Sequence, residues 1–324
     1  MKINAVRPGM ALPGGVVQVE VEGLGDVTSA RAFLGEAPAE LMGASSRTVT
    51  FWVPEGARDG VLIRSGTDEA SAELKIGRVI ASELHPVTNP VVDSFGNVYV
   101  TFSGTRGEKV PFSVFAIYGD ESKQPFLTDI TNPTAMAIGP DNCLYLTSRH
   151  TGAVYRSTFD KQVEKHIDGL GLATGLAFDS QGNMLVGDRS GTIYKVTPEK
   201  EISVLCGLEP SVSAYHLLMG PDDALYVTGP TLATQDSIYR ILPDGTVSTF
   251  FKELGRPQGM AFDRDGNLVV AASYRGRKGI YTVRGGTPEL TVSAPMLVGL
   301  AYSPNFSELY LVDSDKLYRI KLTG

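Results

Sequence analysis

The chain has 324 residues, of which 42% are hydrophobic and 20% charged, and its formal net charge is −7. This acidic balance excludes a generally basic protein that coats nucleic acid, and two cysteines exclude a disulfide-stapled miniprotein. Glycine and proline together make up 55 residues, about 17% of the chain, against an average of roughly 12%. That surplus predicts many tight turns and few long helices.

The beginning of the chain carries no export signal, because residues 1–15 contain no apolar run long enough for a signal-peptide core. No segment reaches the roughly 18 consecutive apolar residues of a membrane-spanning helix. The sequence as it stands therefore predicts a soluble, cytoplasmic protein with no membrane partner. It would be an exported protein only if a leader had been removed.

Residues 1–77 are predicted to form a small β-sandwich. Val17, Val19 and Val21 alternate with polar neighbours, and residues 48–53 read as another strand. The module resembles the IPT/TIG immunoglobulin-like family, on the residues Ile-x-x-Val-x-Pro at 3–8 and Pro-Gly-Gly-x-Val at 13–17. The resemblance implies an immunoglobulin-like sandwich that acts as a spacer or assembly surface.

From residue 88 onward one pattern recurs, in which a short apolar run, a turn and a second apolar run follow one another. Aspartate and asparagine bond their own backbone and glycine tolerates positive φ, so these turns are typical of β-hairpins. The turns lie at 93–97, 139–142, 179–183, 220–223, 263–267 and 303–305.

The second run of each repeat recurs at intervals of 40 to 46 residues, and a third and a fourth run follow it. These second runs centre on Tyr99, Tyr145, Leu185, Tyr226, Val269 and Tyr310. Four short strands in about 42 residues, six times over, predict an all-β fold in which residues 78–324 form a six-bladed β-propeller.

The last repeat ends after its third strand, so its fourth strand has to come from elsewhere. Residues 79–86 read like the fourth strand of another repeat. We therefore expect residues 79–84 to supply the outer strand of the last blade and to close the ring non-covalently.

The repeats resemble NHL-type repeats and the gluconolactonase/senescence-marker family of six-bladed propellers. The residues that carry the resemblance are Gly-Leu-Ala-Phe-Asp-x-x-Gly-Asn at 175–183, its counterpart at 257–267, and Gly-Leu-Ala-Tyr-Ser-Pro at 299–304. The resemblance implies a divalent metal such as Ca²⁺ in the central channel, held by a glutamate, asparagines and an aspartate that precede the innermost strands.

The positions that match this pattern hold no carboxylate. The family's glutamate falls on Thr88 and its aspartate on Gln258, and the two others fall on Ala173 or Thr174 and on Tyr215. Neutral oxygens cannot offset the desolvation of a divalent ion, so no metal or other cofactor is predicted. The candidate ligand-binding residues at the channel mouth are Thr88, Asn89, Thr134, Thr174, Tyr215, His216 and Gln258.

The loops between the second and third strands lie on the same face as the entries to the innermost strands. They carry eight lysines and arginines against five acidic residues, on a chain that is acidic overall. This segregation suggests a surface for an anionic partner, although solvated loops also carry such residues without binding anything. The candidate residues of this loop face are Arg149, His150, Asp188, Arg189, Tyr274 and Arg275.

Two functions fit the sequence. The first is a binding or interaction propeller whose loop face recognises a small-molecule or protein ligand, anionic or carbohydrate in character, with nucleic acid disfavoured by the absence of a dense basic patch. The second is a lactone hydrolase of the gluconolactonase type, or a lyase resembling the streptogramin lyases, with an altered channel site. Divalent metal would be required only for the lactonase alternative.

Overall fold

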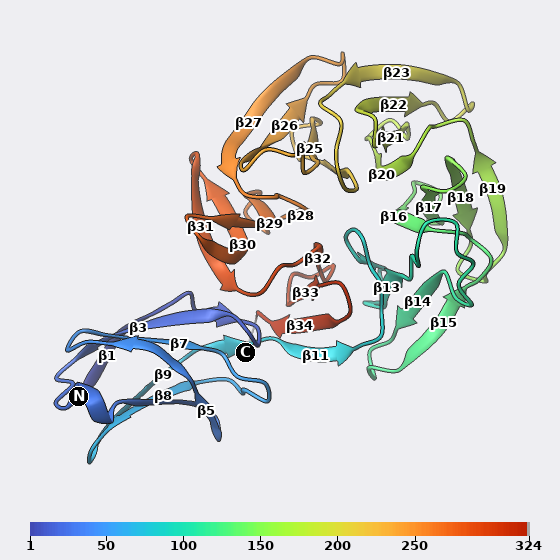
Figure 1. Ribbon diagram of the computed structural model, residues 1–324. Helices are drawn as coiled ribbons and strands as arrows, with labels where there is room; N and C mark the ends of the chain where they lie inside the picture. The colour runs from blue at the N-terminus through green and yellow to red at the C-terminus, as the bar shows by residue number, and fades with distance from the viewer. Residues whose placement is uncertain (323–324) are drawn as a thin grey trace.

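The computed structural model describes residues 1–322, and within them the chain is all-β with one short 3₁₀ turn (η1, Val27–Ser29). Two four-stranded sheets at the N-terminus lie beside a ring of six sheets that follow one another around a central axis (Figure 1). This arrangement confirms the all-β class and the β-propeller. No helix in the described chain is long and apolar enough to cross a membrane.

The two N-terminal sheets face each other across a common apolar core. The first sheet has the order β1 (Lys2–Arg7), β3 (Val16–Glu22), β7 (Thr48–Trp52) and β6 (Leu41–Ala44), and the second β5 (Ala37–Ala39), β4 (Arg31–Leu34), β8 (Val61–Ser65) and β9 (Asp68–Ala72). Val17, Val19 and Phe51 of the first sheet and Leu34 and Ile63 of the second are fully buried in it. The alternation of Val17, Val19 and Val21 therefore points one face of β3 inward, as the sequence predicts.

The first four sheets of the ring are antiparallel, with their strands in chain order from the axis outward. The first sheet has the strands β12 (Val91–Val92), β13 (Val98–Thr101), β14 (Val114–Ile117) and β15 (Lys123–Leu127), and the second has β16 (Pro133–Ile138), β17 (Leu144–Ser148), β18 (Ala153–Ser157) and β19 (Val163–Ile167). The third has β20 (Ala173–Phe178), β21 (Met184–Asp188), β22 (Thr192–Val196) and β23 (Ile202–Gly207), and the fourth has β24 (His216–Met219), β25 (Leu225–Thr228), β26 (Asp236–Ile241) and β27 (Val247–Leu254). All six residues on which the predicted second runs centre lie in the second strands of their sheets.

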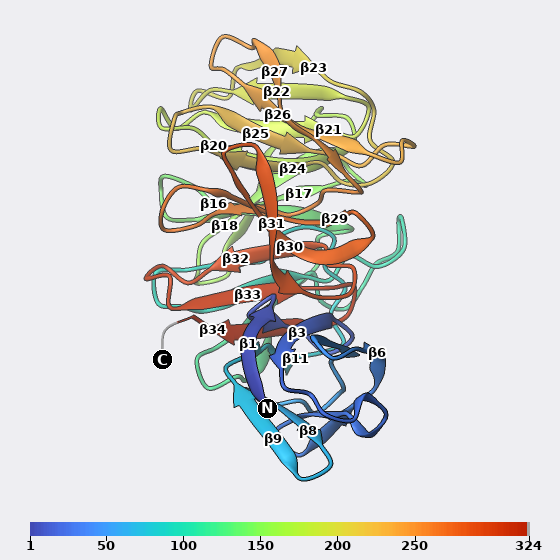
Figure 2. The same ribbon diagram turned by 90° about the vertical axis from the view of Figure 1, so that its left-hand side faces the viewer.

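The fifth and sixth sheets both take strands from the N-terminal part of the chain. The fifth sheet has the strands β28 (Met260–Phe262), β29 (Leu268–Tyr274), β30 (Arg277–Arg284) and β31 (Thr287–Ser293), and it is extended by β2 (Met10–Ala11) and β10 (Lys75–Ile76). The sixth sheet has β32 (Gly299–Tyr302), β33 (Glu308–Val312) and β34 (Leu317–Lys321), and it is extended by β11 (Arg78–Ala81). β2 pairs parallel to β31, and Leu12, which follows it, is fully buried in the propeller core. Figure 2 shows the N-terminal sheets against this side of the ring.

Three of the repeated turns between first and second strands are each held by one aspartate carboxylate. Asp93 accepts hydrogen bonds from the amides of Phe95 and Asn97 and from the Asn97 side chain, at 2.8–2.9 Å. Asp179 and Asp263 do the same in the third and fifth sheets. An aspartate that bonds its own following backbone fixes the hairpin locally, which is why the repeat is readable from sequence.

The ring closes where β11 pairs antiparallel with β34, which confirms the predicted source of the last outer strand. The strand is shorter than the predicted span of 79–84: it ends at Ala81, and Glu83 adopts a φ of +56°. A residue in the left-handed region cannot continue a strand.

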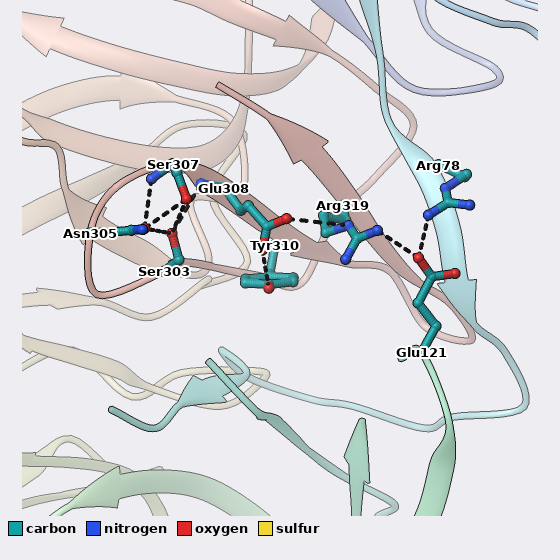
Figure 3. Close-up of polar contacts among 8 residues, drawn as sticks. All are labelled: Arg78, Glu121, Ser303, Asn305, Ser307, Glu308, Tyr310 and Arg319. Carbon is teal, nitrogen blue, oxygen red and sulfur yellow. Dashed lines mark hydrogen bonds and ion pairs between the residues drawn. The ribbon is translucent and has the colours of Figure 1, made fainter. Parts of the chain in front are cut away.

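A polar chain reinforces this closure (Figure 3). Arg78 of β11 and Arg319 of β34 both pair with Glu121, which lies in the turn between the third and fourth strands of the first sheet. Arg319 also lies 3.6 Å from Glu308, whose carboxylate accepts a hydrogen bond from the Tyr310 hydroxyl at 2.5 Å. Glu121 therefore ties the last sheet and its closing strand to the first.

Glu121→Gln should lower the melting temperature by about 3–6 °C. The substitution removes the charge from two charge-assisted contacts, one of them to the largely buried Arg319, and a loss of about 1–2 kcal/mol lowers the melting temperature of a domain this size by roughly 2–4 °C per kcal/mol. Glu69→Gln is the control, because it breaks the exposed Arg64–Glu69 pair of the N-terminal part. Equal melting temperatures for the two variants would contradict the role of Glu121 in closure.

Candidate functional site

The innermost strands of the six sheets place equivalent residues in layers along the central channel. In the first five sheets the last residue of the innermost strand pairs with the first residue of the second strand, and in the sixth Tyr302 pairs with Leu309, which fixes the register between sheets. The residues four positions before the last residue of each innermost strand form what we call the mouth layer: Thr88, Thr134, Thr174, Tyr215, Gln258 and Val298. The next layer, one residue deeper, is Asn89, Ala135, Gly175, His216, Gly259 and Gly299.

Two side chains of the mouth layer, Thr88 and Thr174, bond neighbouring sheets to one another. Thr88 donates to the carbonyl of Thr134 at 2.8 Å, and the Thr174 hydroxyl accepts from the amide of Tyr215 at 3.1 Å. Thr134 donates to the Asn132 carbonyl, and the carbonyl of Gln258 accepts from Thr228 at 2.6 Å. All of these residues are buried, so the layer joins sheets around the channel mouth.

Tyr215 does not face a ligand, which corrects the prediction made for it. Its ring is 1% exposed and packs in the apolar core between the third and fourth sheets. A Cβ added to Gly229 would lie 2.4 Å from this ring, and one added to Gly187 would lie 3.1 Å from the Tyr215 Cβ. The hydroxyl donates to the carbonyl of Glu209, so the whole side chain has a packing role.

Asn89 spans the space between three sheets in the next layer. Its Nδ2 donates to the carbonyl of Met260 in the fifth sheet at 2.8 Å, and its Oδ1 accepts from the amide of Leu300 in the sixth at 3.1 Å. A Cβ added to Gly259 would lie 2.0 Å from Oδ1, and one added to Gly299 would lie 2.6 Å from the Cα of Asn89. The two glycines therefore make room for Asn89.

The channel residues do not fit the divalent metal that the lactonase resemblance implies. Hard cations need several oxygen ligands with negative charge, and the mouth layer offers only neutral groups. The Thr88 and Thr174 hydroxyls among them already hold sheet-to-sheet hydrogen bonds. Both polar atoms of the Asn89 side chain are likewise engaged. Within residues 1–322, no three His, Cys, Asp or Glu side chains are arranged to hold a metal ion.

His216 is fully buried in the same layer, and burial lowers its pKa to about 3. Neither ring nitrogen has a hydrogen-bond partner within the described residues. A neutral imidazole offers one donor and one acceptor, so this side chain presents unused polar capacity just inside the channel mouth.

Arg149, Arg189 and Arg106 form a cationic cluster on the loop face. Burial, Arg189 and Arg106, in that order, lower the pKa of Arg149. Backbone carbonyls orient two of the guanidinium groups: Arg149 donates to Gly104 at 3.1 Å, and Arg189 donates to Ser211 and Val212 at 3.0–3.1 Å. In the part of the chain that the structure describes, none of the three pairs with a carboxylate.

The other loop-face candidates divide between structure and surface. Asp188 is buried and accepts from the amides of Leu172 and Ser190, so it holds its own loop. His150 is exposed beside Gly107, near the cationic cluster.

Tyr274 and Arg275, two candidates for the loop face, lie at the end of β29 and in the tight turn that follows it, and not in a long loop. The strands continue to Tyr274 and from Arg277, and Arg275 and Gly276, with φ of +49° and +78°, form a two-residue hairpin. The Arg275 guanidinium lies 5.0 Å above the Tyr274 ring.

All five buried side-chain polar atoms that lack a partner within residues 1–322 belong to this face. They are Ser103 Oγ, Arg149 Nε, both ring nitrogens of His216, and Asp236 Oδ2. Buried polar groups are nearly always hydrogen-bonded, so their concentration on one face indicates a place where ligand or water completes the bonding.

Asn132 organises the loop beside Arg149, and the sequence reasoning missed it. Its Nδ2 donates to the carbonyls of Ser103 and Thr105, and its Oδ1 accepts from the amide of Gly107. The repeated Thr-Asn-Pro at 88–90 and 131–133 was a signal that could have singled out Asn132 beside Asn89.

No family model matches the chain. Lactonase Drp35 of Staphylococcus aureus (strain bovine RF122 / ET3-1) is 27% identical over an alignment of 187 residues that covers 51% of this chain. The chain spans 58% of the length of this curated relative.

Solved structures show the same fold over nearly the whole chain. An auxiliary nutrient binding protein from Bacteroides ovatus has a TM-score of 0.57 and 12% identity, covering 98% of this chain and 97% of its own. Virginiamycin B lyase from Staphylococcus aureus has a TM-score of 0.55 and 12% identity, covering 95% and 99%. These similarities show a β-propeller fold, and the chain is similar to a lactonase over about half of its length.

Asn89→Asp should lower stability by about 2 kcal/mol, and added Ca²⁺ should not restore it. The aspartate has no amide group to donate to the Met260 carbonyl, so a carboxylate oxygen and this carbonyl oxygen, both acceptors, would face each other. Thermal unfolding with and without Ca²⁺ measures this, and the exposed Asn4→Asp controls for the added charge. A variant stabilised by Ca²⁺ would show that the channel can accept a metal after all.

His216→Leu should flatten the loss of stability between pH 6.5 and 5. The pKa of His216 in the folded protein is about 3, below the ordinary value of 6.5, so in that range only the unfolded state binds this proton. As pH falls, the free energy of unfolding therefore decreases by up to about 1.4 kcal/mol per pH unit. Urea unfolding at a series of pH values measures the slope. The exposed His150→Gln serves as control, and equal slopes in the wild type and His216→Leu would refute the assignment.

Proposed function

We propose that this chain is a ligand-binding propeller that recognises a small anionic molecule on its loop face. In this proposal the six sheets are six NHL-like blades over residues 78–324, and residues 1–77 are an IPT/TIG-like sandwich that serves as spacer or assembly surface. The proposal requires no metal or other cofactor.

The observation that carries the proposal is the unpaired Arg106, Arg149 and Arg189 cluster. Like charges that lower the pKa of a neighbour raise the free energy of the empty site, and an anion would relieve this repulsion. Arg149 keeps a buried Nε without a partner, and a guanidinium suits phosphate or carboxylate because its donors form a planar fork.

The rest of the ligand would lie toward the channel mouth. Ser103, His216 and Asp236 each hold an unpartnered buried polar atom on this face. Hydroxyl groups of a carbohydrate could both donate to and accept from such atoms, so a sugar acid or sugar phosphate fits the combination. The similarity to a nutrient binding protein is consistent with a binding role.

A second candidate is a lactone hydrolase or a lyase that uses an altered channel site, and the similarity to lactonase Drp35 favours it. The mouth layer is neutral, and its Thr88 and Thr174 hydroxyls are engaged between sheets, which argues against metal-assisted hydrolysis at that position. Binding without turnover is therefore the proposal we prefer.

The double variant Arg149→Gln/Arg189→Gln should bind an acidic sugar about tenfold more weakly than the wild type. Calorimetry with glucose 6-phosphate and gluconate, and with neutral glucose for comparison, measures the affinity. Because the contacts are charged, wild-type binding should weaken as salt rises, and the variant should respond less.

The charge-matched control is Arg31→Gln/Arg47→Gln, which removes two arginines from the N-terminal part. Equal weakening in this control, or binding of glucose as tight as that of its phosphate, would contradict recognition by the cluster. Turnover of a lactone by the wild type would instead support the second candidate.

A further inference from the structure

The channel beyond Asn89 opens on the face opposite the loop face, as a cavity of about 450 Å³. We call this cavity the turn-face funnel, because the turns at the ends of the six innermost strands surround it. Its wall has no charged side chain among the described residues, whereas the other four cavities described all carry Asp, Glu, Lys or Arg.

The funnel wall is made of apolar layers supplied by all six sheets. One layer is Val91, Ala137, Ala177, Leu218, Ala261 and Ala301, and the layer nearest Asn89 contains Met136, Leu176, Leu217, Met260 and Leu300. Phe178, Phe262 and Tyr302 lie nearer the opening and remain partly exposed. Burial raises the pKa of Tyr302 to about 12, so its phenol adds no charge.

Phe306 adds an aromatic ring to the wall from a strained backbone position. Its φ is +57°, whereas the corresponding turns of the other sheets place Gly96, Asn142, Gly182, Asp223 and Gly266 in this region. A bulky residue at positive φ costs free energy, and such strain gathers where a side chain is needed in one orientation. The ring packs at 5.4 Å against Tyr302, with the Arg264 guanidinium 5.9 Å from it.

We propose that the turn-face funnel is a second ligand site, which binds an uncharged aromatic small molecule. Aromatic edges and faces and polarisable methionines favour ring-shaped apolar ligands over flexible polar ones. A charged ligand would lose its hydration and meet no counter-charge on the funnel wall. Asn89 bonds across the inner end, between the funnel and the mouth layer. The site is therefore independent of the proposed function on the loop face.

The test uses N-phenyl-1-naphthylamine, a neutral probe with a naphthyl and a phenyl group, whose fluorescence rises in apolar surroundings. Phe306→Gly removes one wall ring and suits the positive φ, so the variant should fold and bind the probe at least about fivefold more weakly. Ala301→Trp should fill the funnel and abolish binding. Phe95→Ser is the control, because Phe95 is 87% exposed and lies outside the funnel wall.

A sulfonated analogue, 1-anilinonaphthalene-8-sulfonate, tests the charge preference in the Arg149→Gln/Arg189→Gln background, which removes the cationic cluster. We expect it to bind the funnel at least about tenfold more weakly than the neutral probe. The proposal is overturned if the neutral probe does not bind, if Phe306→Gly binds it like the wild type, or if the sulfonate binds equally well.

Discussion

A ring of sheets is stable only if its last member meets its first, and here that contact is made without a covalent link. β11 precedes the first repeat in sequence but completes the sixth sheet, so the two ends of the ring are joined by backbone hydrogen bonds. Glu121 adds side-chain contacts from the first sheet to both strands of this seam. This closure determines the width of the channel, because each innermost strand is positioned by the sheets on its two sides.

The same closure explains why one channel holds two chemically different ends. Asn89, from the first sheet, bonds to the fifth and sixth sheets across the seam, and Gly259 and Gly299 leave the space for it. Hydroxyl and amide groups gather on the loop side of Asn89 and apolar side chains on the other. Both polar atoms of the Asn89 carboxamide bond to backbone, so this side chain crosslinks the sheets. We therefore do not interpret the channel as a metal site that has lost its ligands.

The fold could be predicted because its signals are local. Asp93, Asp179 and Asp263 each build a hairpin from their own neighbours, so the repeats are visible without tertiary information. Side-chain direction is not local. Tyr215 and Thr174 are both in the mouth layer, yet the tyrosine turns into the core between sheets because Gly187 and Gly229 leave space there. The electrostatic effect of Arg106 on Arg149 likewise depends on how two sheets of the ring pack, and no spacing along the chain encodes it.

The N-terminal part is more than an attachment to the ring. Leu12 is fully buried in the propeller core, and a Cβ added to Gly77 would lie 2.1 Å from its side chain. Gly15 passes so close to β31 that a Cβ at this position would lie 2.4 Å from the Ser293 carbonyl oxygen. The Ser293 hydroxyl oxygen also accepts a hydrogen bond from the amide of Val16. Separating the chain at the proposed boundary would therefore expose apolar core beside the closing strand. A sandwich that acted only as a flexible tether would not need these contacts, so its position relative to the loop face is fixed by the same packing that closes the ring.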